Sequence, residues 1–285
     1  MSGLKYEGYE LYKACSRGST ELIRRCFFVV LVLIIFNASI AAGQPEETSF
    51  LPVLVYHHIQ DPVKSDVSCT PEQFDLQIAA LIQAGYTPIT LSQARLFLAG
   101  ALRNIDKPVL ITFDDGYESL YFHAKPVAEK YRAPMTVFVI TARIGRRLQF
   151  ANYLNERQIK EMTDCGFFDF GSHTHDLHTD SVAIFDAFEP TDENPVLLLL
   201  QRDLRMSSQR FEIITGRRPE AIAWPYGKYN AAFSAIARKS GFKMHFTSAS
   251  GYNEPGANPF AIKRIPVTSR DTPESVLKKA SGRYR

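Results

Sequence analysis

The sequence is poor in cysteine and has no long run of charge, and each absence excludes a class of protein. Its four cysteines among 285 residues show neither zinc-finger nor redox spacing, and they are too few for a disulfide-held scaffold. Lys and Arg never occur in runs longer than two, and the formal charge is only +3, so no nucleic-acid partner is expected. With 45% hydrophobic and 22% charged residues, a disordered tail, a collagen-like fibre and a coiled coil are also excluded.

A single long apolar run occurs, at 27–36, directly after a pair of arginines and before a stretch of small residues. This order predicts a secretory signal within residues 1–43, cleaved after Ala41 or Ala42. The alternative is an uncleaved membrane anchor, since 26–42 reaches the lower limit of a spanning helix. In both cases the basic residues before the apolar run stay on the cytoplasmic side of the membrane. We therefore expect the rest of the chain to be exported to the periplasm, the cell surface or the medium.

From residue 50 onward, strand and helix patterns alternate without an internal repeat or a Gly/Ser-rich linker. The apolar runs predict strands at 52–57, 87–90, 108–113, 135–140, 167–172, 221–224, 243–247 and 262–267. Amphipathic spacing predicts helices at 91–98, 117–131, 155–165, 195–215, 231–240 and 273–280, and one from the Thr70 cap to Gly85. Repeated β-α units, about seven in number, predict an α/β fold of the distorted (β/α)7-barrel type, as a single domain over 50–282. The stretch 176–194 is predicted to be a long loop at the active-site mouth.

Residues that can do chemistry follow several of the predicted strands. His57 and His58 end the first strand, and Asp114-Asp115-Gly116 follows the third. The segment 173–178 follows the fifth strand and contains three histidines, and 224–227 follows the strand after the longest helix. Because the carboxyl ends of parallel strands converge on one face of a barrel, we expect these groups to meet there.

The carboxylates and histidines together suggest a metal site. Asp114 and Asp115 repel each other after a buried strand unless a cation lies nearby, whereas a surface Asp-Asp-Gly turn is the alternative. His173 and His178 are five residues apart, which does not suit one helical face but allows a loop to close around an ion. One carboxylate and two imidazoles leave coordination positions open for water and substrate, as in catalytic metal sites.

Three of these segments resemble the first three motifs of the polysaccharide deacetylases, carbohydrate esterase family 4. They are Thr112-Phe113-Asp114-Asp115-Gly116, Ser172-His173-Thr174 with the later His178, and Trp224-Pro225-Tyr226-Gly227. The first string is specific when it follows a strand and has a downstream His-Thr partner. The resemblance covers roughly 51–280 and implies a metal-dependent deacetylase on a barrel fold.

Two details resemble the branch of that family that deacetylates poly-β-1,6-N-acetylglucosamine in biofilm matrices. The commonest family form spaces its histidines four apart, whereas Leu177 occupies that place here and His178 follows it. In that branch the barrel order is circularly permuted, and the histidine usually supplied near the C-terminus comes from the first strand. This chain has Tyr56-His57 there and no Leu-x-x-His motif after Val267.

The resemblance implies a role for each matching residue. Three ligands would hold the divalent metal: Asp115, His173 and His178. Zinc is favoured, and iron, cobalt or nickel also suit these ligands. Asp114 would be the general base, and His57 the general acid that donates to the leaving amine. His58 is the rival to His57, because adjacent strand residues point to opposite faces and only one can face the site.

The third motif supplies further implied positions and one departure. The metal and a backbone N–H near Tyr226 would stabilise the oxyanion, and Pro225 and Trp224 would line the substrate groove. A core position is the alternative for Trp224, the only tryptophan. The family usually has an arginine shortly before Pro-Tyr that orients the base, but this chain has Ala223 there, and Arg264 on the last strand is the candidate substitute.

The sequence therefore predicts a metal-dependent hydrolase that removes N-acetyl groups from an N-acetylglucosamine polymer, with the β-1,6-linked exopolysaccharide favoured. Chitin oligomers and peptidoglycan are alternative substrates, and a non-catalytic polysaccharide-binding protein on the same fold is the alternative from another class. A monomer is expected, with membrane contact only through an uncleaved N-terminal segment. After export, Cys69 and Cys165 would either pair or remain as two buried thiols.

Overall fold

The computed structural model describes residues 50–149, 151–178 and 195–283. The contacts divide the chain between residues 47 and 48, and all elements described below belong to the second unit, Thr48–Arg285.

Two predicted features lie outside the described residues. They are the signal or anchor within residues 1–43 and the 179–194 part of the predicted long loop. Within the ranges that the structure describes, none of the helices combines the length and the apolar character needed to cross a membrane. Cys69 and Cys165 are both free thiols.

A parallel β-sheet forms the centre of the second unit. In the described residues it has eight strands: β1 (Val53–Tyr56), β4 (Thr87–Pro88), β5 (Pro108–Phe113), β6 (Met135–Val139), β7 (Phe168–Ser172), β8 (Ala221–Ala223), β9 (Met244–Phe246) and β10 (Ile265–Pro266). They follow the order β10-β1-β5-β6-β7-β8-β9, with β4 pairing to β5 beside that path. Each pairing is parallel, so the carboxyl ends of the strands lie at one edge.

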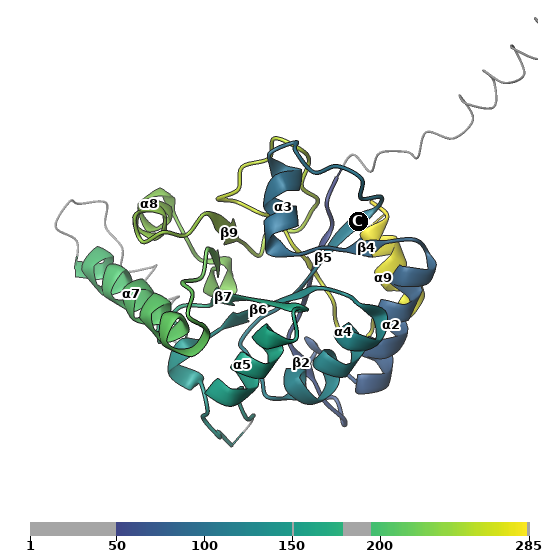
Figure 1. The fold of residues 1–285 in the computed structure, drawn as a ribbon, viewed down its shortest axis with the longest axis horizontal. Helices are drawn as coiled ribbons and strands as arrows, with labels where there is room; N and C mark the ends of the chain where they lie inside the picture. Colours follow the sequence, from purple (N-terminus) through teal and green to yellow (C-terminus); the bar gives the residue numbers. More distant parts are fainter. Residues whose placement is uncertain (1–49, 150, 179–194, 284–285) are drawn as a thin grey trace, which may run out of the picture. The chain divides into compact units, whose positions relative to one another are not determined.

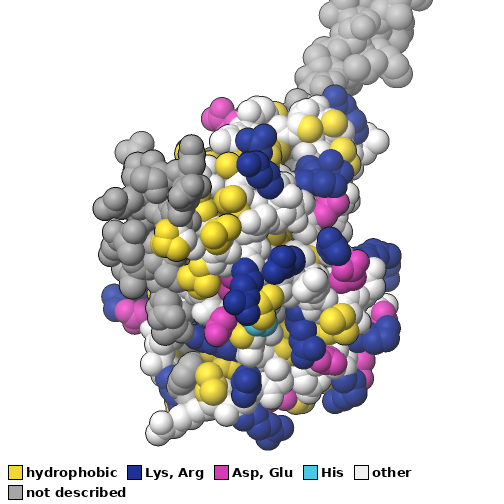
Figure 2. All heavy atoms as spheres, turned by 90° about the vertical axis from the view of Figure 1, so that its left-hand side faces the viewer, with side chains coloured by type: hydrophobic (Ala, Val, Ile, Leu, Met, Phe, Trp, Pro, Cys, Tyr) yellow, Lys and Arg dark blue, Asp and Glu magenta, His cyan; other side chains and the backbone are white. Residues whose placement is uncertain are grey.

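Helices surround this sheet (Figure 1). They are α2 (Pro71–Gln83), α3 (Leu91–Leu98), α4 (Lys125–Tyr131), α5 (Glu156–Asp164), α7 (Pro195–Thr215), α8 (Ala231–Lys239) and α9 (Pro273–Ala280). Thr70, Thr90 and Asn155 cap three of them, each in a capping box with a Gln at the third helical position. Helix α9 packs beside α2, and α8 beside α7. On the face that carries α7 and α8, Lys and Arg side chains are scattered among apolar and acidic ones (Figure 2).

The segment 262–266 brings the two ends of the strand order together. Ile262 forms a parallel bridge with Phe246 of β9, and β10 pairs with β1 through Leu54 and Ile265. The sheet is therefore curled into a distorted, incompletely closed barrel, and the predicted fold class is confirmed. The predicted strand 262–267 shortens to β10 because its residues divide their pairing between two neighbours.

Two local details differ from the sequence prediction. The predicted helix at 117–131 is interrupted by a π-helical turn, η1 (Leu120–Ala124), before α4 begins. Pro126 lies in the first turn of α4, and since it has no N–H it cannot continue the regular ladder from the preceding turn. A small second sheet pairs β2 (His58–Ile59) with β3 (Ser68–Cys69); strands of two residues carry no periodic pattern by which sequence could reveal them.

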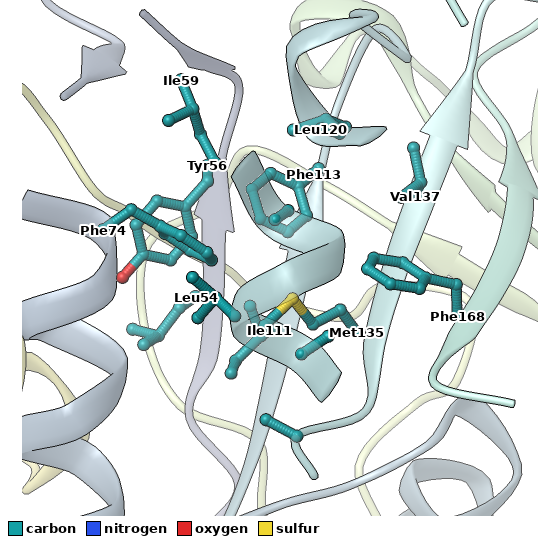
Figure 3. Packing of buried hydrophobic residues seen from close by; sticks show 14 of the residues in the cluster. Leu54, Tyr56, Ile59, Phe74, Ile111, Phe113, Leu120, Met135, Val137 and Phe168 are labelled. Atoms are coloured by element: carbon teal, nitrogen blue, oxygen red, sulfur yellow. The ribbon is translucent and has the colours of Figure 1, made fainter. Parts of the chain in front are cut away.

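Alternate residues of each strand pack on opposite sides of the sheet. Leu54 and Tyr56 on β1, with Ile111 and Phe113 on β5, belong to the main hydrophobic cluster, where they lie close to Phe74 of α2 (Figure 3). The rings of Tyr56 and Phe74 meet edge to face at 5.3 Å between centroids. This cluster holds the helices on the outer face of the barrel.

The intervening residues of the same strands face the other side. Val53 and Leu110 are buried in a second cluster, and Val55 lines the cavity described below. Continuing the alternation past the strand ends places His57 and Asp114 on the same side as Val55. The pleat of β1 and β5 thus directs one imidazole and one carboxylate into the mouth of the barrel.

Candidate active site

A cavity of about 710 Å³ lies at the carboxyl edge of the sheet. Residues that follow β1, β5, β7 and β8 line it, as does Arg264 just before β10. It contains most of the predicted site residues: His57, Asp114, Asp115, His173, His178, Trp224, Tyr226 and Arg264. Pro225 is buried and lines a separate small hollow.

Asp115, His173 and His178 converge on one point of this cavity. The Nε2 atoms of His178 and His173 lie 3.3 Å and 3.7 Å from Asp115 Oδ1, and the three donor atoms lie within 4.8 Å of one another. Asp115 Oδ1 is buried and has no hydrogen-bond partner among the described residues. An orphaned carboxylate oxygen that faces two imidazole nitrogens is costly unless a cation lies between them. These residues therefore fit a divalent metal ion.

His173 is held in the tautomer that a metal ligand needs. Its Nδ1 lies 2.8 Å from the carbonyl oxygen of Ala223 on β8, and because a carbonyl only accepts, Nδ1 carries the proton. The Nε2 lone pair then faces Asp115. Burial lowers the pKa of His173, which favours the neutral ring. Burial raises the pKa of Asp115, but the facing His178 and the charges of the other nearby histidines bring it well below its ordinary value.

Asp114 faces the same cavity but is bonded differently. Arg264 Nη1 and Nη2 donate to its two carboxylate oxygens at 2.7 Å and 2.8 Å, and Arg264 Nε donates to the Thr247 carbonyl at 2.9 Å. Both side chains of the pair are buried. Burial would raise the pKa of Asp114, but Arg264 more than offsets this and holds the pKa below its ordinary value. Arg264 therefore makes the contact expected of the arginine that Ala223 replaces.

The two adjacent histidines of strand one are separated by the alternation of the backbone. His57 lines the cavity, and its Nδ1 is buried without a hydrogen-bond partner in the described part of the chain. His58 instead stacks on Tyr117, with 4.4 Å between ring centroids. Burial, with the nearby Lys64, lowers the pKa of His58 to about 4. The histidine that faces the ligand cluster is thus His57, as the sequence predicts.

Left-handed backbone conformations shape three segments of the site. Asp115 (φ 74°), Thr174 (φ 69°) and Tyr226 (φ 53°) are non-glycine residues in this region, where each costs roughly 1–2 kcal/mol. Gly116 follows Asp115 at φ 79°, and a Cβ there would lie 2.9 Å from Val139 Cγ1. The Asp-Asp-Gly turn therefore needs its glycine both for conformation and for space.

Sequence comparison assigns this architecture to a family. The family model described as polysaccharide deacetylase matches residues 102–245, which include the segments after β5, β7 and β8. YxkH of Bacillus subtilis, whose name places it among the polysaccharide deacetylases, is 30% identical over 223 residues, or 78% of this chain and 73% of its own length. This chain belongs to the polysaccharide deacetylase family. Metal dependence is general for the family, in agreement with the Asp115, His173 and His178 cluster.

One further named protein and two solved structures are also similar to this chain. The poly-β-1,6-N-acetyl-D-glucosamine N-deacetylase of Staphylococcus aureus is 28% identical over 238 residues, 83% of this chain and 80% of that protein. The solved structure of IcaB from Ammonifex degensii matches with a TM-score of 0.71 and 31% identity, over 82% of this chain and 98% of that one. The Streptococcus pyogenes deacetylase PplD, solved with acetate, shares the fold with a TM-score of 0.69 at 24% identity.

The third-motif segment of this deacetylase divides between surface and core. Tyr226 is 60% exposed, and its ring lies 4.9 Å from that of His178 at the cavity wall. Trp224 is only 2% exposed and packs in a cluster with Phe233, while Tyr229 stacks on it at 5.9 Å. The structure thus favours the core alternative for Trp224, because too little of its ring is accessible for a sugar to stack on.

Several cavity residues of the deacetylase were not found from sequence, and three of them are Val67, Tyr117 and Arg143. Arg143 Nη1 donates to the Tyr153 hydroxyl at 2.8 Å, and the rings of Tyr153 and Tyr117 lie 5.2 Å apart. Arg143 belongs to η2 (Thr141–Arg143), just beyond the carboxyl end of β6, and Tyr117 follows Gly116 directly. The convergence of residues that follow the strands also predicts Arg143, which follows β6, and Tyr117, which follows β5.

Proposed function

We propose that this deacetylase removes N-acetyl groups from an N-acetylglucosamine polymer, and that the polymer is poly-β-1,6-N-acetylglucosamine. The proposal is carried by the meeting, in one cavity, of the Asp115–His173–His178 cluster, the arginine-held Asp114 and His57. The S. aureus relative named for this substrate aligns with most of the chain, and IcaB shares the fold at 31% identity. Both similarities favour the β-1,6-linked polymer over chitin oligomers and peptidoglycan.

Asp115, His173 and His178 would hold the divalent metal, which we propose to be zinc because two imidazoles and a carboxylate suit it. Such an ion, when bound, polarises the acetyl carbonyl and lowers the pKa of water toward neutrality. His173 is already oriented for this role by its bond to Ala223. Iron, cobalt and nickel suit the same ligands and are compared in the assay below.

The chain's own residues divide the proton transfers. Asp114 takes a proton from the water whose oxygen bonds to the acetyl carbonyl carbon, while Arg264 keeps its carboxylate ionised and aimed into the cavity. The backbone N–H of Tyr226 is the proposed protein donor to the oxyanion. His57 then donates a proton to the amide nitrogen as the C–N bond breaks. One water is consumed, and acetate and a free amine leave.

We also propose that the deacetylase works outside the cytoplasm. The support is the order of basic pair, apolar run and small residues within residues 1–43, which is typical of an export signal or anchor. Fractionation of cells that produce the full chain would test this. Recovery of the protein in the cytoplasm would contradict it.

Acetate release from β-1,6-linked N-acetylglucosamine pentamer tests the reaction. The chain is stripped with chelator and assayed with zinc, iron, cobalt or nickel, with chitin pentamer and peptidoglycan in parallel. We expect metal-dependent release from the β-1,6 substrate, and a loss of roughly 10²- to 10⁴-fold in kcat for both Asp114→Asn and His57→Ala. His58→Ala is the matched control for His57→Ala, and Asp75→Asn, at an exposed ion pair with Lys130, is the control for Asp114→Asn; both should remain active.

The outcomes separate the alternatives. Release from chitin or peptidoglycan only would keep the chemistry and overturn the proposed polymer. Loss of activity in His58→Ala but not in His57→Ala would show that His58, and not His57, is the general acid. No acetate from any substrate, in a protein that binds both metal and polymer, would identify a non-catalytic polysaccharide-binding protein.

A further inference from the structure

The loop between the two metal-binding histidines has an unusual need for hydrogen-bond acceptors. His173 and His178 are separated by a non-helical turn, so the backbone N–H groups between them have no helical carbonyl partners. Asp203, from the middle of α7, supplies what is missing. The N–H groups of His175 and Asp176 donate to its Oδ1 and Oδ2, each at 2.7 Å, and the Leu177 N–H is also hydrogen-bonded to this carboxylate.

Other polar groups of the loop form hydrogen bonds with η2. The carbonyl oxygens of Thr174 and His175 accept from the N–H groups of Thr141 and Ala142, at 3.2 Å and 2.9 Å. His175 Nδ1 lies 2.9 Å from Thr141 Oγ1, so this middle histidine is engaged by η2 and is not part of the three-residue ligand cluster. The loop is therefore clamped between η2 on one side and α7 on the other.

A second contact from α7 lies one helical turn beyond Asp203. Ser207 is completely buried, and its Oγ lies 2.7 Å from Ser172 Oγ at the end of β7. Ser172 Oγ in turn accepts from the Thr174 N–H at 3.0 Å. The left-handed Thr174 directly after His173 is thereby held by a side chain that α7 orients. Two residues of one helix thus reach the start and the middle of the ligand loop.

We infer that Asp203 is a positioning residue, whose carboxylate gathers the N–H groups of the 175–177 turn and so sets the spacing at which His173 and His178 face Asp115. This inference rests on the proposed metal site. Asp203 is only 5% exposed, and its removal leaves the N–H groups of this turn without their shared acceptor. The loop would then relax and move the two imidazoles out of register. In a helix, backbone carbonyls accept hydrogen bonds from the N–H groups. In this loop, the carboxylate of Asp203 accepts them instead.

Zinc affinity of the full chain, measured by competition with a colorimetric chelator, tests the inference. Asp203→Ala should weaken zinc binding by about 10- to 100-fold. Ser207→Ala should weaken it less, because only the contact through Ser172 is lost. Asp203→Asn keeps one acceptor oxygen and should lie between the wild-type chain and Asp203→Ala. Glu212→Ala is the matched control: it removes a carboxylate from the same helix, but one that forms an exposed ion pair with Arg218, and zinc affinity should be unchanged.

Circular dichroism in chelator establishes that each variant is folded before zinc is added. A folded Asp203→Ala chain with wild-type zinc affinity would overturn the inference. If that variant does not fold, Asp203→Asn and Ser207→Ala decide: weaker zinc binding in both supports the positioning role, and wild-type affinity in both overturns it. Failure of the wild-type chain to bind zinc or any of the other three metals would overturn the proposed function together with this inference, whereas wild-type binding with an insensitive Asp203→Ala chain would overturn the inference alone.

Discussion

The two carboxylates of the Asp-Asp-Gly turn are neighbours in sequence but differ in their hydrogen bonding. Asp114 receives two hydrogen bonds from Arg264 inside the protein, whereas Asp115 Oδ1 has no hydrogen-bond partner among the described residues and faces His173 and His178. The Asp114 side is complete without any bound group. The Asp115 side is a cluster of buried polar atoms that becomes favourable only when a cation joins it.

One turn therefore serves two purposes. The satisfied pair of Asp114 and Arg264 connects the end of β5 to the segment before β10 and so stabilises the barrel. The cluster of Asp115, His173 and His178 lowers the free energy of unfolding of the metal-free protein. Binding of a cation removes this cost and so stabilises the folded state.

Replacement of Arg264 should have the largest effect on stability. Arg264→Met leaves Asp114 buried without its partner, and we expect a loss of about 3–5 kcal/mol in the free energy of unfolding. Urea denaturation in chelator measures this loss without a contribution from metal. Arg218→Met removes an arginine from an exposed pair and should change stability by less than about 1 kcal/mol. Similar losses in the two variants would contradict the comparison.

Metal should stabilise the folded protein through the Asp115 side alone. Zinc at about 100 times its dissociation constant should add about 2.7 kcal/mol, because it binds the folded state and not the unfolded chain. Thermal unfolding with zinc and with chelator measures the shift. Asp115→Ala should abolish it, while Asp114→Asn should retain most of it. A shift that survives in Asp115→Ala would show that the ion binds elsewhere.

The turn that separates the two carboxylates should be sensitive at Gly116. Gly116→Ala places an L-residue at φ 79° and brings a Cβ to 2.9 Å from Val139, so we expect a loss of more than the roughly 1–2 kcal/mol due to conformation alone. Gly100→Ala is the matched control, with φ 67° and no atom within 4 Å of the added Cβ. Equal losses in the two variants would mean that the contact with Val139 relaxes without cost.

A second buried ion pair, outside the ligand cluster, should show the smallest effect. Lys279 Nζ donates to Asp271 Oδ2 at 2.6 Å and to the Pro266 carbonyl at 2.7 Å. Burial raises the pKa of Asp271, but Lys279 and the hydroxyl and N–H donors around it bring the pKa below its ordinary value. A lowered pKa in the folded state stabilises the protein above the ordinary carboxyl pKa, and this contribution is lost as the pH falls toward the folded-state value.

Urea denaturation of the metal-free chain between about pH 6 and pH 3 measures this contribution. In Lys279→Met the acid-side decline in stability should be shallower than in the wild-type chain, because the main partner of Asp271 is absent. An identical pH dependence in both chains would show that the pair is not responsible.

Several features of the site follow from sequence because they depend on neighbours along the chain. The capping boxes at Thr70, Thr90 and Asn155 mark helix starts, and the alternation along β1 distinguishes His57 from His58 once the strand is recognised. Other features depend on residues distant in sequence. Arg264 lies 150 positions from Asp114, so only its absence from the usual place, at Ala223, suggested that another arginine was needed.

Asp203 and the burial of Trp224 show the limit of sequence alone. The apolar spacing of the 195–215 stretch predicts α7, but it does not reveal that a polar residue on the inward side accepts hydrogen bonds from a loop 28 positions earlier. Trp224 follows a buried strand, and only the packing of α8 against that strand decides that its ring belongs to the core.

The alternating elements, the parallel sheet, the family and the residues that gather at the strand ends all follow from the amino-acid sequence. These features arise from backbone periodicity, capping and local motifs, which act over a few residues. The tertiary structure decided which carboxylate is satisfied, which faces the histidines, and which distant side chains hold them in place. These relations depend on how hydrogen-bond donors and acceptors match across packed elements, and no local pattern encodes that matching.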